Sequence, residues 1–389
     1  MHNIVTLTEQ TAKINYDEAE QQFIQLLDLE DLDQKLNADP TIANYFEQAI
    51  AQAIKEAYVE KSNDAAHLRE LGEEEFHWAG STDRGFCPPT PPPQSLVFLQ
   101  RVLYRINRLR LFWYDDLRHY TNERSQYLQS VRDRIEAVWQ EWELSQLDVA
   151  SLQKLDVAAV KQALIERGEK DLDPPLSENN RYLREQMSEA GYRRVLAIGS
   201  FDGLVEGSRM CTILGGAANE VQATLFRVLL EEYGNGRLTR KHSTYFAQML
   251  SEFGMHTEPE AYFDLVPWEV LACANHNFLL TERKRHFLRY NGGLTYFEVA
   301  GPAAYRNYLA AAQRLGLSAA AMGYWELHIR EDERHGRWML DDVALPLADR
   351  YPDDAWELVL GYDQEKLMGD RAGVAIVRSA RIAEQTTKQ

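Results

Sequence analysis

Cysteine is scarce in this sequence, and long hydrophobic runs are missing from it. Cys87, Cys211 and Cys273 are widely separated and form no CxxC pair, which argues against a disulfide framework and fits a reducing cytosol. No window of about eighteen apolar residues occurs, so no segment is expected to span a membrane. The first residues lack the basic and apolar stretches of a secretory signal. We therefore expect a soluble, cytoplasmic protein.

Positive charge is also in short supply. The chain has 42 lysine and arginine residues against 60 aspartate and glutamate residues, which gives a formal net charge of −18. Such a surface repels a phosphate backbone, so no nucleic-acid partner is expected. Hydrophobic residues still make up 45% of the 389 residues, which is ample for packed cores, and a chain of this length favours two domains.

Strand-like alternation is rare as well, and helical spacing of apolar residues dominates, which predicts an all-α fold. Prolines interrupt the helical pattern at residues 81–95 and again at 171–180. The intervening residues 96–144 contain neither proline nor glycine, and they predict one very long helix or two in line. A long amphipathic helix usually packs on a partner, so we expect a homodimer.

The second proline-bearing break is the expected domain boundary. It separates a helical N-terminal domain of residues 1–175, suited to dimerisation, from a helical bundle of residues 181–389. Within the bundle, the apolar pattern predicts helices at 267–290 and 294–315, on either side of a glycine pair.

The sequence "WELHIREDERHGRWMLDD" places two histidines and an aspartate on one face of a predicted helix. His328, Asp332 and His335 follow one another at intervals of four and three residues, which stacks them turn above turn. Trp325 and Met339 extend the same stripe, so the polar trio lies on an apolar face. A charged, exposed face is the ordinary interpretation of such a run, but the spacing favours a set of metal ligands.

A second candidate pair flanks the sequence "YGNG". Glu232 lies on the apolar stripe formed by Leu225 and Val228, where an isolated carboxylate is costly and needs a cation or a donor. Its neighbour Glu231 can be solvated. The glycines end the helix, and His242 begins the next one after the chain has turned back, so Glu232 and His242 can approach each other. The alternative is a glutamate exposed at a frayed helix end.

Two further glutamates have weaker local support. Glu298 lies among apolar and aromatic residues in "GGLTYFEVAGP", where it could equally be an ordinary buried group. Glu206, in "FDGLVEGSRM", has Asp202 as a rival one turn earlier, and exposure is its simpler interpretation. Arg209 is a candidate for binding a substrate carboxylate, although a surface arginine is again the simpler interpretation.

The candidate set contains three histidines, up to four carboxylates and no thiolate. Mixed imidazole and carboxylate ligation without sulfur suits iron or manganese, and this number of ligands suits two ions better than one. Helical bundles build di-iron sites from inward-facing Glu and His side chains at such spacings.

The motifs "EEYGNGRLTRKH", "GGLTYFEVAGP" and "HIREDERH" resemble those of the haem-oxygenase-like di-iron oxidases and oxygenases, and most closely those of the N-oxygenating members. The resemblance covers about residues 185–380 and implies a haem-oxygenase-like helical bundle that holds two iron ions rather than haem. It also favours Glu206 as a metal ligand, because Glu206 stands at the position of an upstream glutamate ligand of that family. The implied metal ligands are Glu206, Glu232, His242, Glu298, His328, Asp332 and His335.

The resemblance further implies an oxidoreductase that uses dioxygen as co-substrate and a reductase or chemical reagent as external electron donor. The expected reaction is the N-hydroxylation of a small-molecule amine, guanidine or amino-acid derivative in specialised metabolism. A di-iron desaturase or C–C bond-cleaving oxidase acting on an amino acid or fatty acid is the alternative within the family. A metal-storing or partner-binding helical protein is the alternative outside enzymology.

Overall fold

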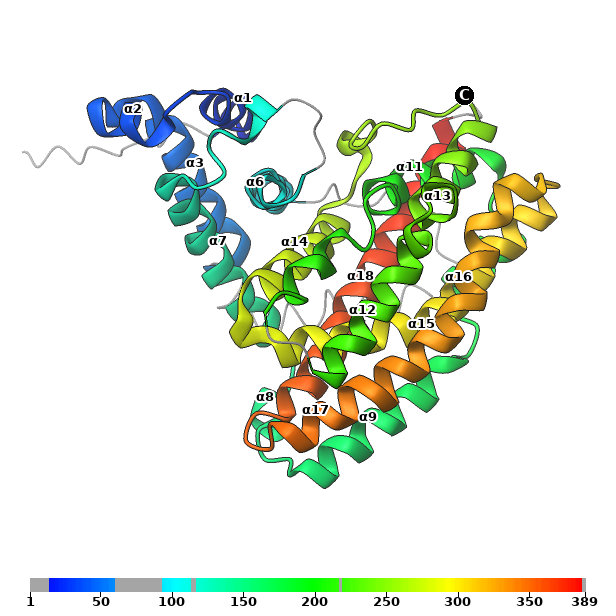
Figure 1. The fold of residues 1–389 in the computed structure, drawn as a ribbon. Coiled ribbons are helices and arrows are strands. Elements are labelled where there is room, and N and C mark those ends of the chain that lie inside the picture. The colour runs from blue at the N-terminus through cyan, green and yellow to red at the C-terminus, as the bar shows by residue number, and fades with distance from the viewer. Residues whose placement is uncertain (1–13, 60–92, 113–116, 217–218, 387–389) are drawn as a thin grey trace, which may run out of the picture. The chain divides into compact units, whose positions relative to one another are not determined.

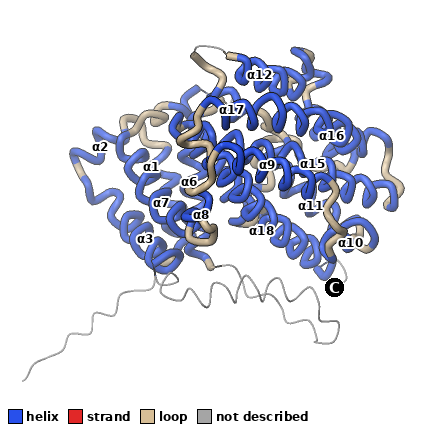
Figure 2. Tube along the Cα trace, turned by 90° about the horizontal axis from the view of Figure 1, so that it is seen from below, coloured by secondary structure: helices blue, strands red, loops and turns tan. Residues whose placement is uncertain are grey.

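The computed structural model describes residues 14–59, 93–112, 117–216 and 219–386 (Figure 1). These residues are largely helical, and no β-strand occurs among them (Figure 2). This confirms the predicted all-α fold. Cys87 and most of the proline-rich stretch lie outside the described residues. None of the described helices is both long enough and apolar enough to cross a lipid bilayer.

The described residues form two compact units. Apart from residues 110–112, which belong to the second unit, the chain passes from the first unit to the second after Trp139. This division lies upstream of the boundary expected at 171–180. The reason is that α9 (Val157–Leu172) packs against α15 (Phe287–Arg314) and α18 (Trp356–Thr386). Residues 140–175, which the sequence analysis assigned to an N-terminal domain, therefore belong to the second unit.

The first unit packs its helices around aromatic side chains. Phe23 and Phe46 are fully buried, and their rings stack with centroids 4.8 Å apart. The first helix begins after Asn15, whose side chain accepts hydrogen bonds from the backbone N–H groups of the first turn. The helices are α1 (Tyr16–Leu27), α2 (Leu32–Ala38), α3 (Asn44–Ile54), α6 (Gln94–Asn107) and the first part of α7 (Gln126–Leu144).

A buried carboxylate in this unit is neutralised by arginines. Glu20 is only 6% exposed. Its carboxylate oxygens lie 3.1 Å from the guanidinium of Arg101 and 3.0 Å from that of Arg105. Charge-assisted hydrogen bonds of this kind offset the cost of removing a carboxylate from water.

Residues 96–144 do not form one long helix. They form α6 and α7, and the described residues between these helices include the short 3₁₀ turns Arg108–Arg110 and Leu117–Tyr120. A new helix starts at Gln126 because polar groups cap it. Ser125 accepts a hydrogen bond from the Leu128 N–H at 3.2 Å, and Asp33 accepts one from the Gln126 N–H at 2.7 Å. The expected homodimer stays a prediction.

The second unit is the helical bundle that carries the predicted ligands. The 3₁₀ segment Ser208–Ile213 follows α11, and a π-helical segment, Trp338–Ala344, connects α16 to α17. Besides α9, α15 and α18, the α-helices are α8 (Val149–Leu152), α10 (Glu178–Glu185), α11 (Glu189–Gly203), α12 (Glu220–Glu232), α13 (His242–Glu252), α14 (Trp268–Glu282), α16 (Ala319–Arg337) and α17 (Leu345–Arg350) (Figure 1).

The long helices α15 and α18 approach each other closely at glycines. A Cβ atom on Gly292 would overlap the carbonyl oxygen of Leu358, and one on Gly361 would overlap the carbonyl oxygen of Arg289. The glycine pair at 292–293, which we expected to separate two helices, therefore lies inside α15. The helix break comes earlier, after α14 ends at Glu282, so the predicted boundary near 290 is wrong. This close crossing fixes α15 and its glutamate within the bundle.

Candidate metal centre

The chain reverses direction between Glu232, the last residue of α12, and His242, the first residue of α13. Gly234 has a positive φ of 60°, and a Cβ atom there would overlap the backbone of Arg240, so this tight corner requires glycine. The reversal brings the two side chains together, with His242 Nδ1 2.9 Å from Glu232 Oε2. Both are buried.

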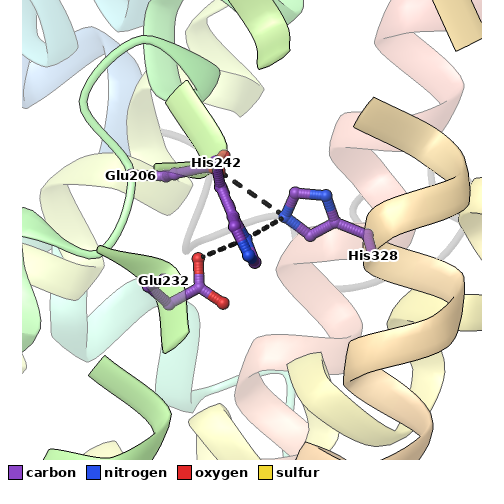
Figure 3. A group of neighbouring side chains, drawn as sticks. All are labelled: Glu206, Glu232, His242 and His328. Atoms are coloured by element: carbon purple, nitrogen blue, oxygen red, sulfur yellow. Dashed lines mark hydrogen bonds and ion pairs between the residues drawn. The ribbon is translucent and has the colours of Figure 1, made fainter. Parts of the chain in front are cut away.

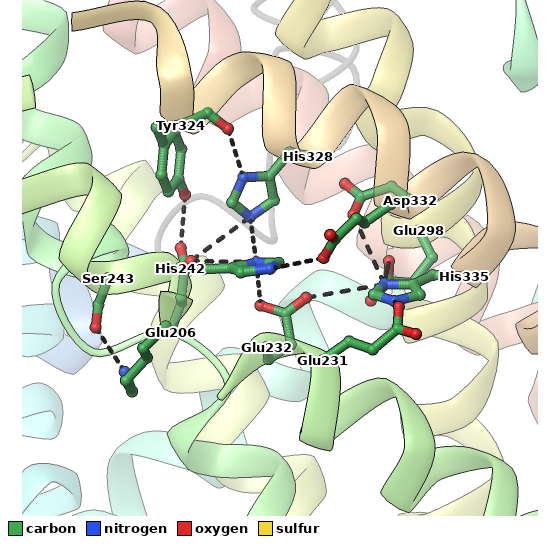
Figure 4. A network of polar contacts seen from close by, with 12 residues as sticks. Glu206, Glu231, Glu232, His242, Ser243, Glu298, Tyr324, His328, Asp332 and His335 are labelled. Carbon is green, nitrogen blue, oxygen red and sulfur yellow. Dashed lines mark hydrogen bonds and ion pairs between the residues drawn. The ribbon is translucent and has the colours of Figure 1, made fainter. Parts of the chain in front are cut away.

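The inward face of α16 carries the polar trio. His328, Asp332 and His335 are 4%, 2% and 0% exposed, and they lie on one stripe. Arg330 and Glu333 on the opposite face are exposed, so the run is not a solvated face. The trio therefore points into the bundle toward α12 and α13 (Figure 4).

Glu206 and Glu298 reach the same region from two other segments. Glu206 follows α11 and accepts a hydrogen bond from the Tyr324 hydroxyl at 2.5 Å, and its other oxygen lies 3.5 Å from His328 Nε2. Glu298 extends from α15 to within 3.3 Å of His335 Nδ1. Gly336 permits this approach of α15 and α16, because a Cβ atom there would lie 3.0 Å from the Glu298 carbonyl oxygen.

The side chains form two groups that share one residue. In each group, one ligand atom from every residue lies within 4.8 Å of the others. Glu232 belongs to both groups, since its Oε2 faces His242 while its Oε1 lies 3.8 Å from His335 Nδ1. The first group is Glu206, Glu232, His242 and His328, and the second is Glu232, Asp332 and His335 (Figures 3 and 4). All seven predicted residues thus converge, with Glu298 beside the second group.

Several buried polar atoms in this cluster lack a hydrogen-bond partner among the described residues. They include both carboxylate oxygens of Asp332, Oε1 of Glu206 and Nδ1 of His335. The last atom is at ion-pair distance from Glu298 but without hydrogen-bond geometry. No lysine or arginine within the described ranges forms an ion pair with the four carboxylates. Because buried polar atoms are nearly always paired, this donor set fits cations that bind oxygen and imidazole, such as iron or manganese.

The electrostatics of the cluster show the same need for positive charge. Burial raises the pKa of Asp332 well above its usual value, and the neighbouring Glu298 and Glu232 add to the effect. Burial opposes a charge on His242, but Glu232 and Glu331 outweigh it and raise the pKa of His242 to about 11. Glu298 similarly outweighs burial and raises the pKa of His335 to about 9. Metal ions that bind these side chains would therefore compete with protons.

Each histidine has one ring nitrogen held by an acceptor outside the cluster. Nε2 of His242 lies 3.0 Å from Glu331, and Nε2 of His335 lies 2.9 Å from Glu231. Nδ1 of His328 lies 2.9 Å from the backbone oxygen of Tyr324. The opposite nitrogen of every ring is thereby left to face the carboxylates. Such outer acceptors fix the tautomer and orientation of metal-binding histidines.

The sequence does not identify Glu231 and Glu331 as functional residues. Its pattern predicts a solvated Glu231, and Glu331 belongs to the charged run around His328 and Asp332. Each precedes a stripe residue by one position, which turns it about 100° away from the buried face. Each glutamate contacts a histidine of another helix, and helical periodicity within one segment cannot predict such a contact.

Comparison with known proteins matches residues 193–364 to a family model described as iron-containing redox enzyme. All seven converging residues lie inside this range. The chain is also similar to a nitrosourea synthase from Streptomyces achromogenes subsp. streptozoticus, with 27% identity over 168 residues. That alignment covers 43% of this chain and 36% of the relative, so the chain matches about a third of the relative's length.

Proposed function

We propose, from the membership of residues 193–364 in the haem-oxygenase-like family of iron-containing redox enzymes, that this protein is a non-haem di-iron oxygenase. The reaction we favour is N-hydroxylation of a small amine, guanidine or amino-acid derivative. The relative's name, nitrosourea synthase, supports a nitrogen-centred reaction. The observation that carries the proposal is the pair of ligand groups that share Glu232.

The residues of the two groups would divide between two iron ions. Glu206, His242 and His328 would hold one ion, and Asp332 and His335, with Glu298 nearby, would hold the other. Glu232 would contribute to both sites, because its two oxygens face different groups. Bound ferrous ions would supply electrons to dioxygen and so generate the oxidant. N-hydroxylation delivers one oxygen atom to the substrate nitrogen and the other to water, and it therefore consumes two electrons from an external donor.

The surrounding side chains would control this chemistry. Tyr324 holds Glu206 through its hydroxyl, and Glu231 and Glu331 keep two histidines in a ligand-ready orientation. Tyr305 and Tyr324 pack their rings against His328, with centroids 4.9 and 4.2 Å away, and so shield that side of the cluster from water. Water exclusion strengthens electrostatic interactions within the site.

A cavity beside the cluster favours an enzyme over a metal store. Its volume is about 340 Å³, at the lower end of small-molecule sites. Its walls include Glu206, Glu232, Glu298, His328 and Asp332, so a bound molecule would lie next to the metal ions.

The proposal is tested by loading the protein with Fe(II) without oxygen and measuring bound iron. We expect two iron ions per chain, oxygen consumption in the presence of a reductant, and an N-hydroxylated product that carries isotopically labelled oxygen. Asp332→Ala should lose iron, whereas Glu333→Ala, on the exposed face of the same helix, should keep it.

Absence of bound iron in the wild-type protein would overturn the proposal. Iron uptake without substrate oxidation would favour storage. A desaturated or cleaved product would favour the other oxidases of the family.

A further inference from the structure

The cavity next to the ligand cluster contains a second set of polar side chains. Asp202, Arg209, Asn277 and Glu365 line it together with apolar residues such as Phe201, Leu280 and Ile376. None of these four belongs to either ligand group. The ligand groups therefore do not account for these four residues.

Arg209 is already paired. It donates hydrogen bonds to Asp202 at 2.5 Å and to Asn277 at 3.0 Å, and its guanidinium lies over the ring of Phe278. Its side chain is only 13% exposed, which corrects the interpretation of Arg209 as a surface residue. Because Asp202 neutralises its charge, Arg209 has little left to offer a substrate carboxylate.

Glu365 is not compensated in this way. It projects from α18, and its carboxylate forms no hydrogen bond or ion pair with any residue that the structure describes. Burial raises the pKa of Glu365 to about 7, even though Arg209 acts in the opposite direction. A carboxyl group in such a position is costly unless a donor or a cation meets it. The cavity is the space from which that partner can come.

The position of Glu365 relative to the metal ligands follows from α15. A Cβ atom on Gly293 would lie 3.3 Å from the Cβ atom of Glu365, so Glu365 faces this turn of the helix. Glu298 comes five residues later on α15, which corresponds to about 7.5 Å along the helix axis. A ligand that touches Glu365 therefore extends over several bonds before it reaches the ligand cluster.

We propose that Glu365 is a specificity-determining residue that binds an ammonium or guanidinium group of the substrate, remote from the atom that is oxidised. The binding claim rests on the cavity and on the uncompensated carboxylate. Only the statement that oxidation occurs at the far end rests on the proposed function. The paired charges would orient the substrate and hold its reactive end near the metal ions.

Isothermal titration calorimetry on the full chain tests this claim without any turnover. The probes are n-pentylammonium and 1-pentanol, which share a carbon chain and differ in charge. Titrations use protein loaded anaerobically with Fe(II), and metal-free protein for comparison. Glu365→Gln keeps the shape of the side chain and removes its charge, and Glu333→Gln, on an exposed face, is the matched control.

We expect the ammonium probe to bind at least about tenfold more weakly to Glu365→Gln than to the wild-type protein, with no change in Glu333→Gln. The alcohol should bind the wild-type protein and Glu365→Gln equally. A thermal melt establishes that Glu365→Gln is folded. Equal affinity of the ammonium probe for the wild-type protein and Glu365→Gln would overturn the proposal. A protein that binds the probe through Glu365 but takes up no iron would contradict only the proposed function.

Discussion

Glu20 in the first unit and Asp332 in the second are buried to nearly the same extent, with 6% and 2% of their surfaces exposed. Glu20 lies against two arginine side chains. Within the part of the chain that the structure describes, neither oxygen of Asp332 has a hydrogen-bond partner, and its ion-pair neighbour is His335, at 3.7 Å. The first carboxylate is compensated within the chain. The second belongs to a cluster without such a partner among the described residues, and this difference separates a structural ion pair from a candidate metal site.

Addition of Fe(II) should change the stability of the second unit more than any other experiment changes the stability of either unit. If two sites each bind Fe(II) at about 100 times their dissociation constant, each adds about 2.7 kcal/mol to the free energy of unfolding. The melting temperature of the second unit should then rise by about 10 to 20 °C. Differential scanning calorimetry under anaerobic conditions measures the shift. Asp332→Ala should lose most of it, and an equal shift in this variant would contradict the assignment.

Removal of the compensated carboxylate should have the next largest effect. Glu20→Ala removes the buried carboxylate that lies against the guanidinium groups of Arg101 and Arg105, and we expect a loss of about 2 to 4 kcal/mol in the stability of the first unit. Chemical denaturation measures this loss, with Gln21→Ala on the exposed side of α1 as control. The loss should be the same with and without Fe(II). Dependence on the metal would show that the two regions are not independent.

Asp332→Asn should have the smallest effect on stability. In the metal-free protein this substitution should stabilise the fold, whereas Glu20→Ala destabilises it. Burial raises the pKa of Asp332, so its carboxyl group destabilises the fold at neutral pH. This destabilisation becomes smaller as the pH falls toward the pKa of the same aspartate in the unfolded chain. Replacement by neutral asparagine should therefore raise the stability at pH 7 by about 1 to 2 kcal/mol. Denaturation between pH 4 and pH 7 should show this gain shrinking as the solution becomes more acidic. A loss of stability at pH 7 would contradict the description of the cluster.

Helical periodicity was informative where a residue's role depends on its own helix. The intervals of four and three in α16 place His328, Asp332 and His335 on the buried face, and the apolar stripe of α12 does the same for Glu232. The corner after α12 could be inferred from its glycines, since one of them requires a positive φ. These features follow from the geometry of a single helix and from the conformational freedom of glycine.

Periodicity was uninformative where a role depends on a neighbouring helix. It left open whether residues 96–144 form one helix or two, because Asp33, far away in the sequence, caps the start of α7. It gave no role to Glu331, which is turned away from the stripe and acquires its function when His242 arrives from α13. It did not indicate Glu365, whose significance comes from the cavity that it faces.

The amino-acid pattern alone specifies an all-helical chain and the residues that each helix turns inward, because the period of an α-helix is a local property of the backbone. Which of these inward-facing residues meet depends on how the helices pack. Glu232 lies between two ligand groups because the helices cross at specific places, such as the contact of Gly292 with the backbone of α18. Those crossings depend on the volumes of side chains throughout the core, which no single segment of the sequence contains.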